Sequence, residues 1–305
     1  MTVAEDLTTT RALTTGSAKR MPRRRRTRHD IIRSAVFHVL SLALVVVVLY
    51  PAAWMLLSSF KPSDQIVGDV GLLPKEFTLD NFLTALDGIA GISFWTFFGN
   101  SMALAVLSVI GIVASSSVTA YAFARISFAG RGMWFALMIG TLLLPFHVVI
   151  IPQYIVFSQA GLVNTYLPLL LGKYLATEAF FVFLIVQFMR GVPRDLDEAA
   201  RLDGAGHGRI FFSIMLPLMR PALVTSAIFA FIWTWNDFFG PLLYLKKPDL
   251  YTMPIALRLY VDATSTSDFG AQMAMAVLAL VPVLVFFLVF QRYIIGGMAS
   301  SGLKG

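Results

Sequence analysis

Residues 192–217 read VPRDLDEAARLDGAGHGRIFFSIMLP, the one long polar stretch between strongly apolar segments in the C-terminal two thirds of the chain. Pro193 suits the first turn of a helix, and the acidic residues after it would lie at the positive end of the helix dipole. Gly204, Gly206 and Gly208 are expected to end this helix. A short charged helix between membrane spans cannot be buried in lipid and has little core of its own, so we expect it to dock into another protein. The alternative is a solvated loop without a partner.

The composition of the whole chain is that of an integral membrane protein. Hydrophobic residues make up 57% of the 305 residues, charged residues only 13%, and the mean hydropathy is +0.76. A soluble domain of ordinary composition carries about 25% charged residues. The chain has no cysteine, which excludes a disulfide framework, a thiolate metal site and a thiol nucleophile. It also lacks the phosphate loop GxxxxGK followed by Ser or Thr, so we expect no ATP hydrolysis and no enzymatic activity of its own.

Apolar segments long enough, or nearly long enough, to cross a membrane recur along the chain. There are six of them, at residues 36–57, 97–122, 133–157, 166–189, 222–239 and 273–290. The predicted fold class is therefore all-α, a polytopic membrane protein whose six transmembrane helices form a domain of residues 35–295. Residues 1–34 are expected to form a basic, largely disordered tail, and residues 296–305 a second tail.

The placement of lysine and arginine predicts which side each loop faces. With the N-terminus inside, most of the 24 basic residues fall on the inner side, and the short inner loops all carry arginine. Both termini and the segment 192–217 are therefore expected in the cytoplasm. The arginine run at 23–26 also fits a nucleic-acid arm or a twin-arginine export signal, but an apolar segment follows at once. We favour a cytoplasmic flank of a membrane span, and expect no nucleic-acid partner.

The polar stretch also resembles a known family. Its pattern is similar to the EAA signature of the inner-membrane permease subunits of ABC importers, and the matching residues are Glu198, Ala199, Ala200, Gly204, Ile214, Leu216 and Pro217. In that family the helix sits in a cleft of a cytoplasmic ATPase subunit and transmits its motion to the membrane spans. The resemblance therefore implies the type I permease fold of ABC importers, and ATPase coupling by Asp195, Glu198, Ala199, Ala200, Asp203, Gly204, Ile214 and Pro217.

Three further segments resemble permeases that import carbohydrates. They are AYAFARISFAGRG at residues 120–132, WTWNDF at residues 233–238 and the tail GGMASSGLKG at residues 296–305, which is similar to the tail of the maltose-type permeases. The resemblance of the tail implies that Gly302, Lys304 and Gly305 contact the ATPase.

An aromatic ring beside an amide and a carboxylate suits a sugar, because the ring face packs on C–H groups and the polar groups bind hydroxyls. We therefore assign Trp233, Asn236, Asp237 and Glu178 to a substrate path. The alternative is that the tryptophans at 233 and 235 belong to an aromatic belt at the outer interface of the membrane.

Lys173 and Glu178 lie within the fourth span, where charge is costly and usually functional. Because they are five residues apart, we do not expect them to face each other on one helix. Lys173 is near the outer end of the span, where its side chain would reach the membrane surface. Glu178 would either line the substrate path or form a buried structural pair.

Two neighbouring spans carry features that bear on packing and gating. A stripe of small residues in the second span, which includes Ala105, Ser108 and Gly111, is expected to pack against another helix. Pro145 and Pro152 interrupt the third span, and a break there is expected to form part of a gate.

The two long outer loops are candidate contact surfaces. Residues 58–96 are expected to dock an extracytoplasmic binding protein, and to contain a short helix capped by Asp80. Residues 240–269 are expected to contact the delivered ligand or its carrier. The alternative for the first loop is a surface without a partner.

Together these features predict the permease subunit of an ATP-driven ABC importer that carries a sugar or oligosaccharide across the cell membrane. The expected partners are a second homologous permease, two ATP-binding subunits, an extracytoplasmic sugar-binding protein and membrane lipid. The chain itself is expected to bind no cofactor and no metal, because ATP would be bound by a partner subunit. The alternatives are an ABC permease for a non-sugar solute, an ion-gradient-driven secondary transporter that uses Lys173, Glu178 and Asp237, and a membrane enzyme that uses Ser58 or His147.

Overall fold

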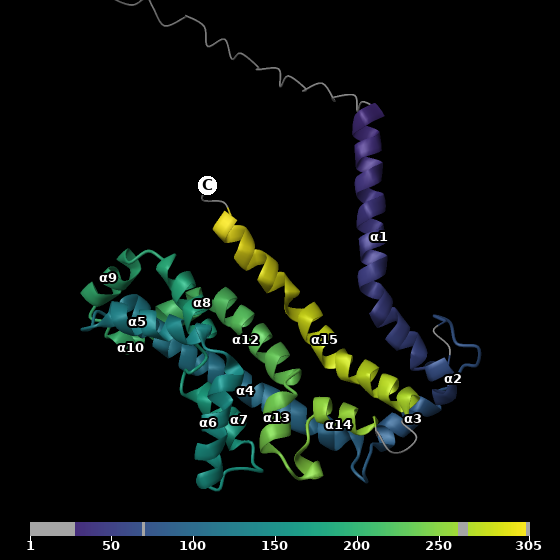
Figure 1. Cartoon of the computed structure of the whole chain (residues 1–305). Helices are drawn as coiled ribbons and strands as arrows, with labels where there is room; N and C mark the ends of the chain where they lie inside the picture. The colour runs from purple at the N-terminus through teal and green to yellow at the C-terminus, as the bar shows by residue number, and fades with distance from the viewer. Residues whose placement is uncertain (1–27, 69–70, 262–267, 303–305) are drawn as a thin grey trace, which may run out of the picture. The chain divides into compact units, whose positions relative to one another are not determined.

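The computed structural model describes residues 28–68, 71–261 and 268–302. Within these ranges the regular structure is helical, apart from an isolated β-bridge between Ile89 and Ile92. The chain divides into two compact units, residues 1–51 and 52–305. The helix α1 (Arg28–Ser58) begins in the first unit and ends in the second, and all other helices in the described ranges belong to the second (Figure 1).

The second unit combines long apolar helices with short ones. The long helices are α4 (Phe94–Arg125), α12 (Arg220–Trp235) and α15 (Phe269–Gly302). The shorter α-helices are α2 (Ser63–Gly68), α3 (Asp80–Asp87), α5 (Arg131–Gly140), α6 (Phe146–Gln159), α7 (Leu167–Tyr174), α8 (Ala179–Arg190), α9 (Asp195–Leu202), α10 (His207–Ile210), α11 (Leu216–Leu218), α13 (Phe239–Tyr244) and α14 (Met253–Leu259). A π-helical turn, Phe211–Met215, joins α10 to α11, and 3-10 turns lie at Thr141–Leu143 and Pro248–Leu250.

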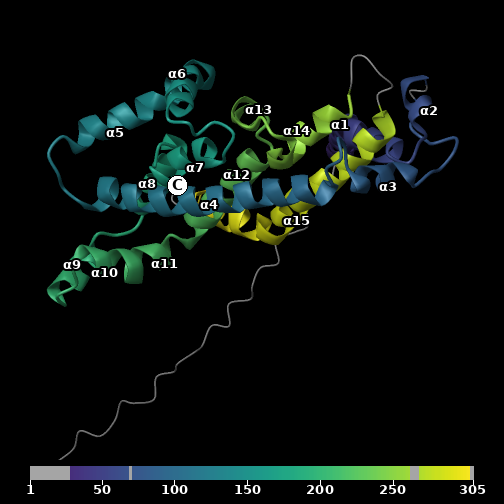
Figure 2. The same cartoon turned by 90° about the horizontal axis from the view of Figure 1, so that it is seen from below.

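The second unit is packed around α4. This helix contacts α3, α7, α8, α12 and α14, while α15 packs against α12 and α3 (Figures 1 and 2). The N-terminal part of α4, with Phe97, joins a hydrophobic core with α12, α14 and α15. The C-terminal part, with Ala120, joins a second core with α8 and the segment α9–α11. The two ends of α4 are therefore held by different sets of helices.

Small residues let α4 approach its neighbours closely. Ala105, Ser108 and Gly111 are all buried. A Cβ atom at Gly111 would lie 2.6 Å from a ring carbon of Tyr174 in α7, which is closer than side chains pack. Helices in lipid associate where small side chains permit such contact. The predicted packing role of this stripe is confirmed.

Four helical segments are long and apolar enough to cross a membrane, at residues 32–58, 94–125, 167–190 and 269–291. Two bent pairs satisfy the same test if each pair is one span: residues 131–143 with 148–159, bent by 99°, and residues 207–218 with 220–235, bent by 75°. The described residues thus contain four to six spans, in agreement with the predicted polytopic all-α fold. The first bend lies at Pro145, whereas Pro152 lies inside α6 without ending it.

The predicted tails are partly helical. α1 already begins at Arg28, inside the predicted tail of residues 1–34. α15 continues through residues 296–302 of the predicted C-terminal tail. Gly296 and Gly297 do not end the helix, since a glycine in a helix interior costs only about 1 kcal/mol. Helical structure therefore extends beyond the predicted boundaries of the transmembrane domain at both ends.

The segment of residues 58–96, predicted to be an outer loop, contains two short helices, α2 and α3. Asp80 is the first residue of α3 rather than its cap, and its backbone nitrogen donates to Thr78 Oγ1 at 3.1 Å, so the predicted cap was wrong. The side chain of Asn81 is buried and donates to the carbonyl oxygens of Ser59 and Lys61 at 2.9 and 2.7 Å. These contacts tie α3 to the chain that precedes α2.

Candidate functional site

The segment predicted to dock with an ATPase begins with the amphipathic helix α9. Three acidic residues lie in its first turn, where negative charge stabilises the positive end of the helix dipole. Gly204 has φ of +80°, a conformation that favours glycine, and Ala205 N donates to Ala200 O at 2.9 Å across the turn. The sequence therefore predicted both the helix and the glycine that ends it.

Most of the residues assigned to ATPase coupling lie on the side of this segment that faces away from the helical core, which we call its outer face. The exposed ones are Asp195, Glu198, Ala199, Asp203, Gly204 and Pro217. Ala200 is buried in the core formed with α4 and α8, and Ile214 is half-buried. Leu202 and Phe212, which were not predicted, are 89% and 66% exposed. The outer face thus combines charge with exposed apolar side chains, as a protein-docking surface does.

A buried ion pair holds the inner face of α9. Asp197 Oδ2 lies 3.1 Å from a guanidinium nitrogen of Arg125, the last residue of α4, and the two side chains are 8% and 3% exposed. The other terminal nitrogen of Arg125 donates to the carbonyl oxygens of Met189 and Val192, both at 2.8 Å. Sequence reasoning missed both charged residues. The available signal was an arginine closing one apolar span on the same side of the membrane as an acidic helix.

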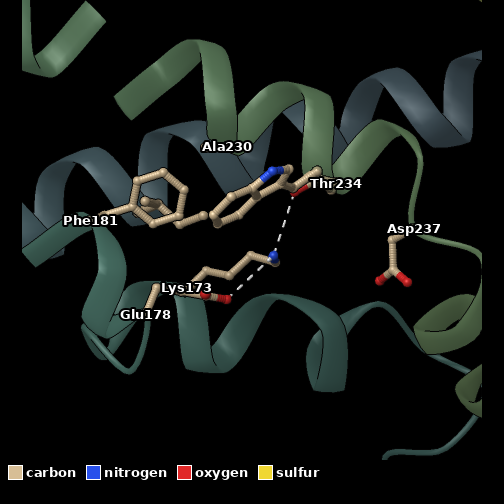
Figure 3. Close-up of a pocket in the computed structure, with 8 residues that line it drawn as sticks. Lys173, Glu178, Phe181, Ala230, Thr234 and Asp237 are labelled. Carbon is tan, nitrogen blue, oxygen red and sulfur yellow. Dashed lines mark hydrogen bonds and ion pairs between the residues drawn. The ribbon is translucent and has the colours of Figure 1, made fainter. Parts of the chain in front are cut away.

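A second candidate site is a polar cavity of about 230 Å³ between α4, α7, α8 and α12 (Figure 3). Its lining residues are Ile112, Lys173, Glu178, Phe181, Ala230, Trp233, Thr234 and Asp237. Lys173 Nζ lies 3.8 Å from Glu178 Oε1 and 3.5 Å from Thr234 Oγ1, so the lysine links the α7–α8 pair to α12. Figure 3 shows the carboxylate of Asp237 apart from this pair. It accepts a hydrogen bond of 3.1 Å from Gly240 N.

Three of the four residues assigned to the substrate path line this cavity, namely Glu178, Trp233 and Asp237. Asn236 does not, because its side chain is exposed and donates to the carbonyl oxygen of Ile232 in its own helix at 2.8 Å. The cavity therefore brings an aromatic ring and two carboxylates together without the amide.

The two tryptophans of the WTWNDF string have different surroundings. Trp233 lines the cavity and is 47% exposed. Trp235 is 3% exposed, and its indole nitrogen donates to the carbonyl oxygen of Ala279 in α15 at 3.1 Å. Trp235 is therefore part of the core.

The contact between Lys173 and Glu178 corrects the expectation that these charges do not face each other. α7 ends at Tyr174 and α8 begins at Ala179, so the fourth span is not one continuous helix. Ala176, between them, has φ of +55°, which is uncommon for a residue other than glycine. The break turns Glu178 back toward Lys173. The lysine side chain, 19% exposed, is held in the cavity rather than extended to the membrane surface.

The remaining candidates are covered only in part by the described residues. Gly302 is the last residue of α15, and Lys304, Gly305 and the side chain of His147 lie outside the described part. Ser58 is fully buried. Within the ranges that the structure describes, no three His, Cys, Asp or Glu residues are placed to hold a metal ion.

The chain is similar to known proteins over most of its length. Residues 109–300 match the family described as "Binding-protein-dependent transport system inner membrane component". The arabinooligosaccharides transport system permease protein AraQ of Halalkalibacterium halodurans is 36% identical, over 85% of this chain and 92% of that protein. The trehalose/maltose transport system permease protein MalG of Thermococcus litoralis is 28% identical, over 91% of this chain and 99% of that protein.

The fold has a counterpart among solved structures. A chain in the crystal structure of a bacterial ABC transporter involved in the import of the acidic polysaccharide alginate matches with a TM-score of 0.78 at 22% identity, covering 88% of this chain and 98% of that chain. This likeness confirms the predicted importer-permease fold. Because the family match covers more than half of the chain and AraQ is 36% identical over most of both proteins, the chain belongs to the family of inner-membrane components of binding-protein-dependent transport systems.

Proposed function

We propose that this chain is the permease subunit of an ATP-driven importer for a sugar or oligosaccharide. The observation that carries the substrate class is the similarity to permeases named for arabinooligosaccharides and for trehalose and maltose, the first of them 36% identical. The proposed partners are a second homologous permease, two ATP-binding subunits and an extracytoplasmic sugar-binding protein.

The chemistry of the cavity supports a hydroxylated solute. The ring of Trp233, which is 47% exposed, offers an apolar face to C–H groups, and the buried ring of Phe181 packs behind it with a centroid distance of 5.2 Å. Lys173, Glu178 and Asp237 offer charged donors and acceptors to hydroxyl groups. The cavity of about 230 Å³ is smaller than the roughly 300–1,000 Å³ of common ligand pockets. It would hold part of an oligosaccharide at a time, as a subsite along a path does.

Coupling to ATP hydrolysis would pass through the outer face of α9. Glu198 and the strongly exposed Leu202 on this short helix, with Asp203 directly after it, present charge and an apolar contact. A cleft on an ATP-binding subunit would hold this helix, and closure of the two ATP-binding subunits would carry it along. The spans would then pass between two alternative packings, one open to each side of the membrane.

Both termini and α9 are placed in the cytoplasm in this proposal. The distribution of arginine among the short loops supports that orientation. It also puts α9 on the side where ATP is available. The outer loops would then face the binding protein.

Uptake by the reconstituted transporter tests the proposal. The permease pair, the ATP-binding subunits and the binding protein are placed in proteoliposomes, and labelled arabino- and malto-oligosaccharides are offered. Accumulation of a sugar is expected only when both ATP and the binding protein are present. Uptake that needs a proton gradient and no ATP would contradict the proposal in favour of a secondary transporter. ATP-dependent uptake restricted to a non-sugar solute would contradict the substrate class alone.

A further inference from the structure

Arg125 joins three segments of the second unit through one guanidinium group. It is the last residue of α4, and its side chain is 3% exposed. It donates to Met189 O near the end of α8, to Val192 O in the turn that follows, and it pairs with Asp197 in α9. One cation therefore contacts the end of one membrane helix, the end of another and the first turn of α9.

The geometry requires an arginine rather than any basic residue. The last carbonyl groups of a helix have no partner within the helix, and Arg125 donates to one of those of α8, Met189 O, and to Val192 O just after the helix. A cation at this negative end is also favourable. The second terminal nitrogen contacts Asp197 Oδ2 at 3.1 Å, so the planar guanidinium reaches three acceptors in different directions. A lysine ammonium is a compact point charge that reproduces this spread of donors poorly.

Asp197 differs from the other acidic residues of α9 in the direction that it faces. Asp195 and Glu198 are exposed, whereas Asp197 is buried against α4. The only apolar residue buried beside it on α9 is the small Ala200. Within α9 itself, the Arg125–Asp197 pair is the directional contact with α4, and a hydrogen bond of 3.3 Å between Tyr121 and His207 adds a second tie just after the helix.

We propose that Arg125 is a positioning residue for transport coupling. Through Asp197 and the two carbonyl groups, it makes α9 move together with the ends of α4 and α8. A displacement of α9 by an ATP-binding subunit then reaches both membrane helices. This rests on the proposed function, because it takes α9 to be the helix that an ATP-binding subunit holds.

Two single variants and their combination test this role in the complete reconstituted transporter. Arg125→Lys keeps the charge and removes the planar spread of donors, and Asp197→Asn keeps the shape and removes the charge. Arg131→Lys is the matched control, because Arg131 lies near the same end of α4 and donates a hydrogen bond of 3.2 Å to Ile126 O rather than to α8 or α9. The measurements are the amount of inserted protein, co-purification of the ATP-binding subunits, and sugar imported per ATP hydrolysed.

We expect the variants at Arg125 and Asp197 to insert, to co-purify with the ATP-binding subunits, and to hydrolyse ATP. Sugar imported per ATP should fall about five-fold or more, the lower end of the usual range for coupling between sites. The double variant should be no worse than the poorer single variant, because both changes remove the same contact. The control should match the wild type.

A wild-type ratio of sugar to ATP in Arg125→Lys would overturn the positioning role. So would a loss of uptake that only follows a loss of inserted protein, since that is what a purely structural residue gives. If Asp197→Asn inserts poorly, Arg125→Lys alone decides, because it preserves the buried charge balance. Failure of the wild-type chain to co-purify with the ATP-binding subunits would instead refute the proposed function, and the two failures are thus distinguishable.

Discussion

Glu178 is a residue whose replacement should change transport more than stability. Its side chain is 37% exposed and lies 3.8 Å from Lys173. Ion pairs this open typically contribute about 0–1 kcal/mol to stability. Glu178→Gln is therefore expected to leave insertion and thermal stability unchanged. Loss of a hydrogen bond from a charged acceptor to a sugar hydroxyl should weaken the apparent affinity about ten-fold, as such bonds contribute about 1.5–3 kcal/mol.

The dependence of uptake on sugar concentration measures this effect. Asn236→Gln is the matched control, because Asn236 belongs to the same predicted path but lies outside the cavity. Its apparent affinity should stay within about two-fold of the wild type, whereas the loss of a charged hydrogen bond of about 1.5–3 kcal/mol weakens affinity about ten-fold or more. A wild-type curve for Glu178→Gln would remove Glu178 from the substrate path.

The two tryptophans allow binding and stability to be separated. Trp235→Leu would leave the Ala279 carbonyl without its donor, at a cost of about 1–3 kcal/mol. The melting temperature of the purified chain should fall by about 2–4 °C per kcal/mol, while the sugar affinity of the folded fraction is retained. Trp233→Leu, at a position 47% exposed, should retain the melting temperature and weaken the affinity for sugar. Equal melting temperatures for the two variants would contradict these assignments.

At the scale of the helix, α9 is expected to act through its outer face. Glu198 is exposed in the first turn, where it makes no buried contact in the described structure. Glu198→Lys should therefore leave insertion intact and abolish most ATP-coupled uptake, because it reverses the charge on the proposed docking face. Glu76→Lys, at an exposed acidic residue in the loop of residues 58–96, is the matched control for adding the same charge. Normal import by Glu198→Lys would show that α9 is not the coupling helix.

The helices that the sequence predicted well are those set by local signals. Acidic residues and Gly204 mark the two ends of α9, and Pro145 marks the bend before α6. The break between α7 and α8 has no such signal, because the left-handed residue there is Ala176 rather than glycine. That break brings Lys173 and Glu178 into contact. Because no local signal predicts the break, the sequence indicates that the two charges lie apart.

Contacts between helices distant in the chain were beyond sequence reasoning for another reason. The pair of Arg125 and Asp197 depends on how the ends of α4 and α8 meet α9, and no periodicity records that arrangement. The same holds for Trp233 and Trp235, which are two residues apart on α12. Trp233 faces the cavity, whereas Trp235 faces α15, and the sequence does not show which neighbour each helix face contacts.

At the scale of the whole molecule, composition and charge placement predicted the class of protein without any detail of packing. The apolar fraction of 57% requires a lipid environment, and the family match extends over residues 109–300. The number of spans was less accessible, because two of the predicted spans correspond to bent helix pairs. Pro145 indicated the first bend, whereas the sequence predicted no bend for the second pair.

The helix α4 connects the two candidate sites. Ile112 lines the cavity and Arg125 ends the helix at the coupling segment. At 1.5 Å per residue, these positions are about 20 Å apart along the axis. A movement transmitted to the end of α4 would therefore reach the cavity through one continuous helix.

The central claim is that α9 lies in the cytoplasm and is held by an ATP-binding subunit. The chain has no cysteine, so Leu202→Cys introduces its one thiol, at a side chain 89% exposed in the wild type. Lys247→Cys, at an exposed residue that the proposal places on the outer side, is the control for the opposite side. A membrane-impermeant maleimide is applied to intact cells and to inside-out vesicles, with and without the ATP-binding subunits. We predict that the thiol at position 202 reacts only in inside-out vesicles and is protected when the ATP-binding subunits are bound. Labelling of that thiol in intact cells, or labelling that the ATP-binding subunits do not change, would contradict the account.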